Sequence, residues 1–551
     1  MTERSEKNYL KGAAILAASV VIAKLVGALF KIPLYNLLGT DGTAHFNKTY
    51  QIYTLLLAIS YSGIPAALSR LISAAGETGR ERQIARYHSV ALPAFAAVGA
   101  AVSALMFIFA PQLAEFMKDP QAQAGIRTLS PAVFLCCVVS VYEGYAQGHG
   151  DMLPTAIKQF LEVTCKLIFG MAVAVALINR GADSGTTAAG AITGSVIGLV
   201  ISLPVLIAYK RRRERRISPR IGGGIAERGD KPALSVKSTL AAIFRVSVPI
   251  TLGASFMSVL TLLDSRVVSL RLEASGLTHA EAISKFGIYS QCQTIFSFPP
   301  SLISAITVSV LPAISAAAAG KRSAEARGIT ESAMKLVCLA AMPAAVGITV
   351  LSGPIFRALY GVSAAAEDGA RILAILGAAS FFACAQLLTT VILQANGRER
   401  VPMATFIIGG AAQLALDYVL VGDRRIGIIG SPVGTLVCYA LITVINLIVI
   451  KLKTPDPARV TRSAVKPLMI SAVMGATAYS VYGLSRKLLG TTFGSGRTAE
   501  VFALAPAILV AVVIYAVLAV VAGAITREDL KYVPKGVRIA DLLRLPPDKN
   551  R

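Results

Sequence analysis

Long apolar stretches follow one another along almost the whole chain, separated by short polar segments. A helix of about 20 apolar residues is long enough to span the hydrocarbon core of a bilayer. About fourteen stretches of this kind are present. They lie near residues 13–39, 46–74, 88–113, 128–147, 153–179, 187–209, 239–270, 286–317, 333–356, 371–395, 402–422, 428–450, 465–485 and 499–525. The pattern predicts an all-α polytopic membrane protein.

The polar segments alternate between rich and poor in Lys and Arg. The segment before the first helix and the one after every second helix hold most of the 54 Lys and Arg residues. Because loops rich in Lys and Arg stay on the cytoplasmic side, both termini are predicted to be cytoplasmic and the protein to lie in the cell (plasma) membrane. In this setting the net charge of +24 indicates contact with an anionic inner leaflet and not with nucleic acid.

Two matching turns indicate an internal repeat. Residues 147–154 and 394–402 are each a tight turn that ends in Pro at the start of an apolar helix. Six helices separate the copies, so both have the same orientation, as in parallel repeats about an axis along the membrane normal. The predicted parts are an N-terminal lobe of six helices (1–209), a basic cytoplasmic linker (210–237), a C-terminal lobe of six helices (238–453), two further helices (454–525) and a cytoplasmic tail (526–551). Two such lobes are typical of a transporter with a central cavity.

The first apolar stretch carries two lysines, Lys24 and Lys31, and no acid. They are seven residues apart, close to two helical turns, so both ammonium groups project from one face. Charges inside a spanning helix are costly and usually face a polar cavity. The pair therefore indicates a cavity that receives an anion. In the alternative interpretation, Lys31 reaches the outer headgroups and Lys24 pairs with an acid on another helix.

The fifth predicted helix carries Lys158, Glu162 and Lys166 at i, i+4 and i+8. These side chains share a face, and Glu162 can pair with either lysine. Glu143 on the fourth helix is a further possible partner of the lysines. The stripe is either a self-neutralising structural feature or part of the cavity lining, to which it adds a spare positive charge.

Further charges lie within predicted helices. Asp264 and Arg266 are two residues apart on the seventh helix, so they point in different directions. Arg70 lies near an inner helix end, where its side chain is expected to reach the interface. Asp417 on the eleventh helix could be a counter-charge or a cation site. Prolines at 65 and at 299–300 are predicted to kink the second and eighth helices.

No enzyme signature, metal-ligand spacing or cofactor motif is found in the sequence. All seven cysteines fall in apolar segments and are interpreted as small packing residues. We therefore expect a protein that is not an enzyme, has no catalytic residues, metal or cofactor, and draws on a gradient, a membrane potential or substrate supply.

Several segments resemble a known family. They are KLVG at 24–27, the stretches at 50–73 and 144–162, LDS at 263–265, and FSFPPSLISAITVSVLPAIS at 296–315. In their order and spacing the chain resembles the polysaccharide-exporter branch of the multidrug/oligosaccharidyl-lipid/polysaccharide (MOP) superfamily. Within this branch it is most similar to the stage V sporulation protein B type and to the MurJ-type lipid II flippases.

The resemblance implies a fourteen-helix fold with two lobes and alternating access. It implies a flippase that moves an undecaprenyl-pyrophosphate-linked peptidoglycan precursor, lipid II, from the inner to the outer leaflet. The implied cavity is lined by helices one, two, seven and eight, and helices thirteen and fourteen form a groove for the lipid tail. Implied partners are the lipid-linked glycan, membrane lipids and cell-wall synthesis proteins, and the protein is expected to be a monomer. Whether it serves growth and cell shape or sporulation is left open.

The resemblance also bears on the site. Lys24 occupies the position of the first basic residue of the lipid II flippases' first helix, and Lys31 is one place off the second. Arg70 matches the sporulation branch, and the arginine expected before the eighth-helix prolines is replaced by Gln293 and Thr294. The substrate-binding residues predicted from the charges and the resemblance are Lys24, Lys31, Arg70, Glu162, Lys166, Asp264 and Arg266.

Other functions stay open. A flippase for another lipid-linked oligosaccharide fits the same features. A MATE-like multidrug or cation antiporter should have acids in its first lobe, and the first helix has only lysines. A glycosyltransferase or polymer ligase should have a large outside loop with catalytic acids, and the outside loops are short. A non-transporting scaffold is the fourth possibility.

Overall fold

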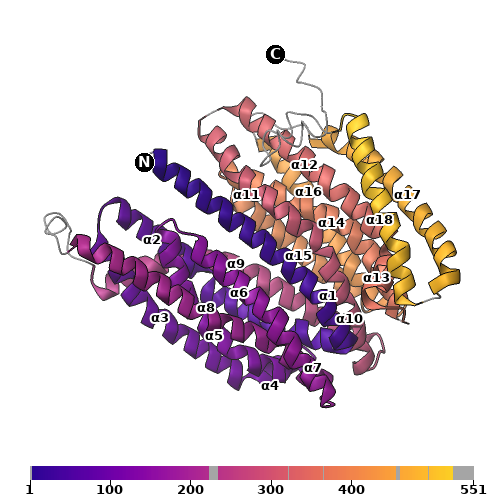
Figure 1. Ribbon diagram of the computed structural model, residues 1–551, viewed down its shortest axis with the longest axis horizontal. Helices are drawn as coiled ribbons and strands as arrows, with labels where there is room; N and C mark the ends of the chain where they lie inside the picture. Colours follow the sequence, from indigo (N-terminus) through magenta and orange to yellow (C-terminus); the bar gives the residue numbers. More distant parts are fainter. Residues whose placement is uncertain are drawn as a thin grey trace. The chain divides into compact units, whose positions relative to one another are not determined.

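The computed structural model describes residues 3–221, 234–320, 322–363, 365–453, 460–493 and 496–524. Every regular element in these ranges is a helix, which confirms the predicted all-α class. The chain forms two compact units, Met1–Leu270 and Arg271–Arg551, whose helices are labelled in Figure 1. This division does not test the predicted boundaries of the lobes and of the parts that follow them.

Unit 1 contains the first predicted helices in chain order. They are α1 (Glu3–Tyr61), α2 (Gly63–Glu77), α3 (Glu81–Ile108), α4 (Ala110–Phe116), α5 (Ala122–Gly148), α6 (Leu153–Cys165), a π-helix η1 (Lys166–Gly170), α7 (Met171–Asn179), α8 (Ser184–Ile221) and most of α9 (Val236–Ala274). Helix α5 packs against α1, α2, α3 and α8 and is the centre of the unit. An apolar cluster that includes Ile64, Leu68 and Ile72 of α2 fills the space toward α3.

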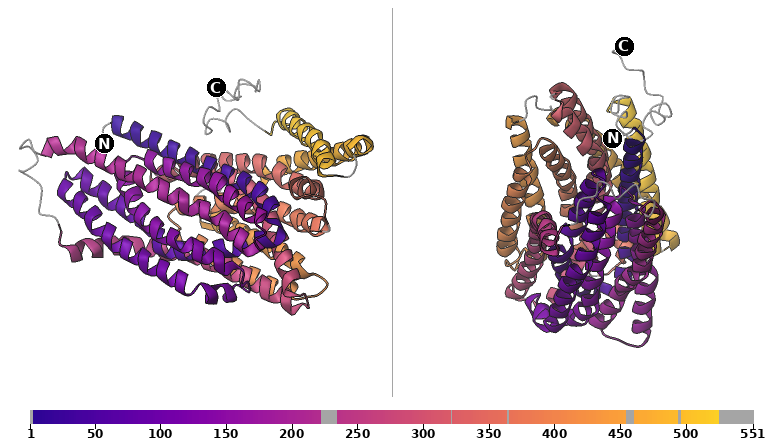
Figure 2. Two further views of the ribbon diagram at one scale, coloured as in Figure 1. Left: turned by 60° about the horizontal axis from the view of Figure 1, so that its bottom comes forward. Right: turned by 90° about the vertical axis from the view of Figure 1, so that its left-hand side faces the viewer.

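Unit 2 contains the remaining helices. They are α10 (His279–Phe296), α11 (Phe298–Ala319), α12 (Ser323–Val350), α13 (Ser352–Tyr360), α14 (Ala365–Ala395), α15 (Arg400–Leu420), a 3-10 turn η2 (Gly427–Ile429), α16 (Gly430–Lys453), α17 (Val460–Phe493) and α18 (Arg497–Val521). Helix α14 is the centre and packs against α11, α12, α13 and α16. Helices α17 and α18, yellow-orange in Figure 2, pack on each other. Helix α17 also packs on α12.

Twelve helices in the described residues are long and apolar enough to cross a membrane, so the chain is a multi-pass membrane protein. The predicted count of fourteen stays a prediction, because two of the predicted spans are not separate helices of this kind. The first two run together in α1 through a kink at Gly39, whose φ of 68° requires glycine. The eighth is divided between α10 and α11 at Ser297.

Both predicted proline kinks coincide with helix breaks. The helix ends at Tyr61 and restarts at Gly63, two residues before Pro65. A proline nitrogen cannot donate to the carbonyl four residues back, so Pro65 leaves the carbonyl of Tyr61 without its helical partner. Pro299 and Pro300 have the same effect on the turn around Ser297.

Candidate functional site

The first helix carries the two lysines that the sequence predicts for an anion. The side chain of Lys31 is half-buried, and among the described residues it makes no ion pair. The side chain of Lys24 lies outside the described residues. A joint role of the two ammonium groups therefore stays a prediction.

The best-defined group of buried charges in unit 1 lies on α5, on α6 and on the first residue of η1. The Nζ atom of Lys158 is 3.2 Å from Oε2 of Glu162 and 3.9 Å from Oε1 of Glu143. The Nζ atom of Lys166 is 3.2 Å from Oε1 of Glu162. These four residues, the four-charge cluster, contain two lysines and two acids, so their formal charges cancel. The geometry therefore supports the self-neutralising interpretation of the stripe, because Glu143 balances the charge that Lys158, Glu162 and Lys166 leave over.

Tyrosines of α1 complete the four-charge cluster. Tyr61 donates its hydroxyl hydrogen to Oε2 of Glu143 at 2.8 Å, and Lys166 donates to the hydroxyl of Tyr50 at 2.6 Å. The Nζ atoms of Lys158 and Lys166 lie 6.0 and 5.1 Å from the ring centroids of Tyr61 and Tyr50, within the range of cation–π attraction. Each lysine thus has a carboxylate and an aromatic partner, and hydrogen bonds join α1 to α5 at Glu143 and to η1 at Lys166.

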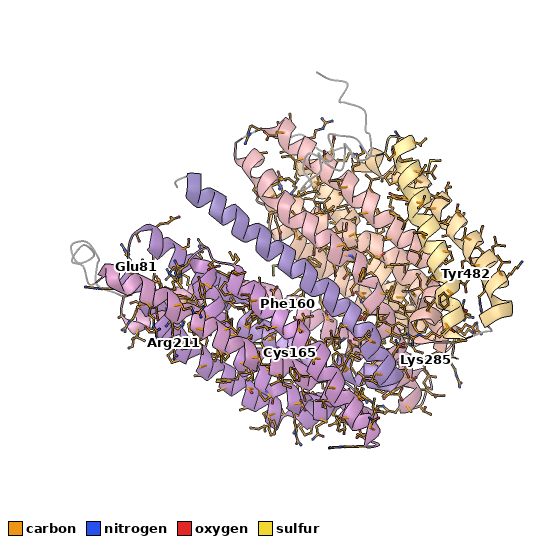
Figure 3. The ribbon with its side chains drawn as sticks, in the orientation of Figure 1. Glu81, Phe160, Cys165, Arg211, Lys285 and Tyr482 are labelled. Carbon is orange, nitrogen blue, oxygen red and sulfur yellow. The ribbon has the colours of Figure 1, made fainter. Side chains whose placement is uncertain are left out.

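Backbone packing holds the four-charge cluster in place. Helix α6, marked in Figure 3 by Phe160 and Cys165, passes at Lys166 into the π-helix η1. Helix α8 approaches this turn so closely that a Cβ atom at Gly194 would lie 2.7 Å from the amide nitrogen of Gly170. At Gly198 it would lie 2.9 Å from Cα of Glu162. Small residues that allow two backbones to meet are typical of helix contacts in membranes. A π turn interrupting an α-helix is often found at a functional site.

The other predicted site residues of unit 1 lie elsewhere. Arg70 is exposed on α2, and Asp264 is buried on α9. The guanidinium of Arg266 lies 3.9 Å from the ring centroid of Phe116 in α4 and donates to the carbonyl of that residue. Of the predicted substrate-binding residues, the structure joins Glu162 and Lys166 directly, and no contact recorded in the described ranges links Arg70 or Arg266 to them.

A second buried polar group was not predicted. The Nδ1 atom of His45 lies 2.8 Å from both carboxylate oxygens of Asp119, and both side chains are buried. Lys48, one turn along from His45, is also buried and donates to the carbonyl of Lys118 at 3.3 Å. The only signal in the sequence is the run of polar residues at the start of the second apolar stretch, because the partners lie about 70 residues away.

Unit 2 has a buried ion-pair network that the sequence did not reveal. Oε1 of Glu500 on α18 lies 3.1 Å from Nε of Arg357 on α13 and 3.3 Å from Nε of Arg486 on α17. Tyr482 donates to Oε2 of Glu500 at 2.5 Å and accepts from Arg357 at 3.2 Å. This network connects the last two helices to the rest of unit 2 at the end marked by Tyr482 in Figure 3.

Asp417 is fully buried on α15 and faces α16, where a Cβ atom at Gly434 would lie 2.5 Å from its Oδ1. This placement is compatible with a counter-charge and with a cation site. Within the described ranges, no three His, Cys, Asp or Glu side chains form a group that could hold a metal ion.

Comparisons with known proteins agree with this architecture. The sequence model of the family described as "Polysaccharide biosynthesis protein" matches residues 9–318, more than half of the chain. In Bacillus subtilis (strain 168), the Lipid II flippase MurJ is 23% identical and Stage V sporulation protein B is 23% identical. The first alignment covers 92% of this chain and 94% of the relative, and the second covers 96% and 98%. An uncharacterized membrane protein of the same organism, YabM, is 23% identical over 97% of this chain and 96% of its own length.

Solved structures show the same fold. The Lipid II flippase MurJ in an inward closed conformation has a TM-score of 0.66 at 14% identity and covers 92% of this chain and 98% of its own. An inward-facing MATE family transporter of the MOP superfamily has a TM-score of 0.61 at 14% identity, with 84% and 99% covered. The activities named among these relatives are those of flippases and transporters and not of enzymes. This chain is a multi-pass membrane protein with the fold of the lipid II flippase and MATE transporters, and it belongs to the polysaccharide biosynthesis protein family.

Proposed function

We propose that this protein is a flippase that moves an undecaprenyl-pyrophosphate-linked glycan, lipid II in the first instance, from the inner to the outer leaflet by alternating access. The observation that carries the proposal is the similarity to a lipid II flippase in both sequence and fold, over nine-tenths or more of each chain. Family membership adds the link to polysaccharide biosynthesis.

Electrostatics supports an anionic substrate. A pyrophosphate in a cavity of low dielectric requires cations, and lysines supply them as point charges. Lys24 and Lys31 on the first helix are proposed to meet the pyrophosphate, with Arg70, Lys166 and Arg266 as further cations. Glu162 and Asp264 are proposed to orient these cations or to meet sugar hydroxyls.

The remaining parts follow from the proposal. Both termini are placed in the cytoplasm, and the lobes at 1–209 and 238–453 rock about the substrate. The helices of 454–525 hold the lipid tail. The protein acts as a monomer without a cofactor and delivers its product to cell-wall synthesis proteins in the plasma membrane.

A MATE-like cation antiporter is the alternative, because the MATE fold is also similar. It would need acids free to bind a cation in the first lobe. Glu143 and Glu162 each lie within 4 Å of a lysine ammonium group, which already occupies the place of such a cation. Because both acids are already paired, the helices that carry them, α5 and α6, favour the flippase over the antiporter.

The test is complementation of a strain depleted of its own lipid II flippase with the wild type, Lys24→Ala and Lys24→Arg at equal protein levels. The expected result is growth with the wild type and Lys24→Arg and lysis with Lys24→Ala. If the wild type is well expressed and still does not support growth, the proposed substrate would be another undecaprenyl-linked glycan and not lipid II. Full rescue by Lys24→Ala would show that this charge is not needed for transport. Resistance of the strain to cationic drugs, without rescue, would favour the antiporter.

A further inference from the structure

A groove on the surface of unit 1 has no part in the proposed transport cycle. Helices α3 and α5 pack side by side (Figure 1), and the groove lies between them with a volume of about 550 Å³. Its apolar lining consists of Ala100, Ala104, Phe107 and Ile108 of α3 and Pro131 and Phe134 of α5. Phe107 and Ile108 are 52% and 64% exposed, so the groove is open on one side.

The polar atoms in the lining are satisfied within the protein. Pro131 has no N–H, so the carbonyl of Arg127 lacks its helical partner. The hydroxyl of Ser130 donates to that carbonyl at 2.8 Å, and the hydroxyl of Ser103 donates to the carbonyl of Ser130 at 2.8 Å. Because both hydroxyl hydrogens are used in this way, the groove suits a hydrocarbon chain better than a polar ligand.

The length of the groove matches one leaflet of a membrane. Its α3 side runs from Ala100 to Ile108, about 12 Å at a rise of 1.5 Å per residue. Half of a hydrocarbon core about 30 Å thick is about 15 Å. In the proposed topology α3 begins on the cytoplasmic side, so Ile108 lies toward the outer surface. One acyl chain of an outer-leaflet lipid fits this length, whereas an undecaprenyl chain is much longer.

A cation lies at the outer end of the groove. Arg127 is exposed, lies one helical turn before Ser130, and has its guanidinium carbon 5.7 Å from the ring centroid of Phe107. The amide oxygen of Gln123, in the orientation that satisfies both ends of this amide, accepts from the two terminal nitrogens of Arg127 at 3.1 and 3.3 Å. This contact orients the guanidinium and leaves about three of its five N–H groups for another acceptor.

Acids at the same end of unit 1 leave this charge unpaired. They are Asp41, Glu115, Asp119, Asp183 and Asp264. Asp119 is already paired with His45 at 2.8 Å, and Asp183 accepts from the backbone nitrogen of Thr186 at 3.1 Å. Within the described ranges, Arg127 forms no ion pair with any of these acids. An anion bound there would therefore meet a positive charge that no carboxylate holds.

We propose that this groove binds one anionic glycerophospholipid of the outer leaflet, with an acyl chain between α3 and α5 and the phosphate on the guanidinium of Arg127. Parallel N–H groups of an arginine can bind two phosphate oxygens at once. A zwitterionic lipid carries its own ammonium group, which Arg127 repels and which competes for the phosphate. The inference does not depend on the substrate that the protein transports.

The experiment titrates the full chain in detergent micelles with phosphatidylglycerol, phosphatidylcholine or glycerol 3-phosphate, and native mass spectrometry measures the bound ligand. The wild type should bind phosphatidylglycerol about tenfold more tightly than phosphatidylcholine, and glycerol 3-phosphate not measurably. Arg127→Gln should bind phosphatidylglycerol about tenfold more weakly and phosphatidylcholine almost unchanged, because it removes a charged donor. The matched control is Arg180→Gln, an exposed arginine at the same end, which should change the affinity less than about twofold.

A second pair of variants tests the groove and leaves the charge in place. Ala104→Phe puts a ring where the acyl chain is proposed to lie, and should weaken the binding of both lipids about tenfold. Its control is Ala176→Phe at an exposed position of α7, which should change the affinity less than about twofold. Phosphatidylglycerol with a photoreactive group in its acyl chain should label residues 100–108 or 130–134 of the wild type.

The contrary outcomes are equally defined. Equal affinity of the wild type for the two lipids would overturn the proposal, and so would equal losses in a variant and its control. Binding of glycerol 3-phosphate as tight as that of phosphatidylglycerol would show that the groove takes no part, and labelling confined to other segments would place the lipid elsewhere. All four substituted positions are exposed. If a variant nevertheless fails to fold, the lipid preference and the labelled segment of the wild type decide.

Discussion

At the scale of single residues, Glu162 balances the charges of two lysines in the four-charge cluster. It lies 3.2 Å from both Lys158 and Lys166, and all three side chains are at most one-fifth exposed. Glu162→Gln leaves two ammonium groups on one helix face with Glu143 as the remaining nearby acid. The free energy of unfolding should fall by about 3 kcal/mol, as when one partner of a buried ion pair is removed. Thermal or denaturant unfolding of the purified protein in nanodiscs measures this change.

An exposed pair of the same spacing provides the control. Arg371 and Glu367 are also four residues apart and are paired at the protein surface. Glu367→Gln should cost no more than about 0.5 kcal/mol, because exposed ion pairs contribute little. Similar losses in the two variants would contradict the importance given to the four-charge cluster. The double variant Glu162→Gln and Lys166→Gln should recover part of the loss.

At this scale, local pairs were predictable and distant ones were not. The spacing of Lys158, Glu162 and Lys166 is enough to place them on one face and to predict their pairing. Tyr50, by contrast, is 116 residues from Lys166 in sequence, and nothing in its local pattern indicates that it accepts a hydrogen bond from that lysine. The buried His45–Asp119 pair and Glu500 were missed for the same reason.

Among the elements, α8 is positioned by its glycines at 190, 194 and 198. A methyl group at Gly194 would lie 2.7 Å from the nitrogen of Gly170 and 2.9 Å from the carbonyl oxygen of Cys165. Both are backbone atoms, which cannot rotate away as a side chain can. Gly194→Ala should therefore lower the unfolding free energy by about 1–3 kcal/mol, as overpacking does in a well-packed interior. The measurement is the unfolding midpoint in nanodiscs.

Gly328 on α12 is the matched control, since no atom lies within 4 Å of a methyl group placed there. Gly328→Ala should be neutral or stabilising by up to about 1 kcal/mol, because Ala favours the helix over the unfolded chain. If Gly194→Ala is as stable as Gly328→Ala, α8 can move away from η1 at little cost.

Helix breaks differed in how far sequence could predict them. The interruptions at Ser62 and Ser297 were indicated by prolines, whose effect on the helix is local and chemical. The kink at Gly39 and the π-helix at Lys166 were not predicted, because glycine does not impose a bend and the π turn has no residue signature. The π-helix is the place where α8 packs closely, at Gly194.

For the whole molecule, the proposed topology makes opposite ends of α8 accessible from opposite sides. Arg180 precedes α8 in a proposed outside loop, and Arg212 lies near its basic inner end; both are exposed. In intact cells, Arg180→Cys should react with a membrane-impermeant maleimide, and Arg212→Cys should react only after permeabilisation. The reverse pattern would show that the termini face outward.

The native cysteines make this labelling simple. All seven are free and buried, so the wild type should give little background in both conditions. Strong labelling of the unmodified chain would mean that the native cysteines become accessible to the maleimide in the membrane. The Arg180→Cys and Arg212→Cys variants would then have to be made in a chain without its native cysteines.

The membrane character and the helical class followed from hydropathy alone, because each span must satisfy its own backbone hydrogen bonds in lipid. The central helices of the two units, α5 and α14, were not distinguished beforehand. Their apolar composition resembles that of lipid-facing helices, since burial in protein and exposure to lipid select similar residues. Which intramembrane charges meet substrate depends on contacts made during transport.

The π-helix at Lys166–Gly170 bears on how this family's chains vary in length. Such a turn accommodates one residue more than an α-helical turn while the helix beyond it keeps its facing. A relative that lacks one residue at Leu167–Phe169 would have a continuous α-helix there and still present the same side of α7 to its neighbours. Deletion of Ile168 should thus be tolerated in this span, whereas deletion of a residue in the middle of α5 would rotate everything after it by about 100°.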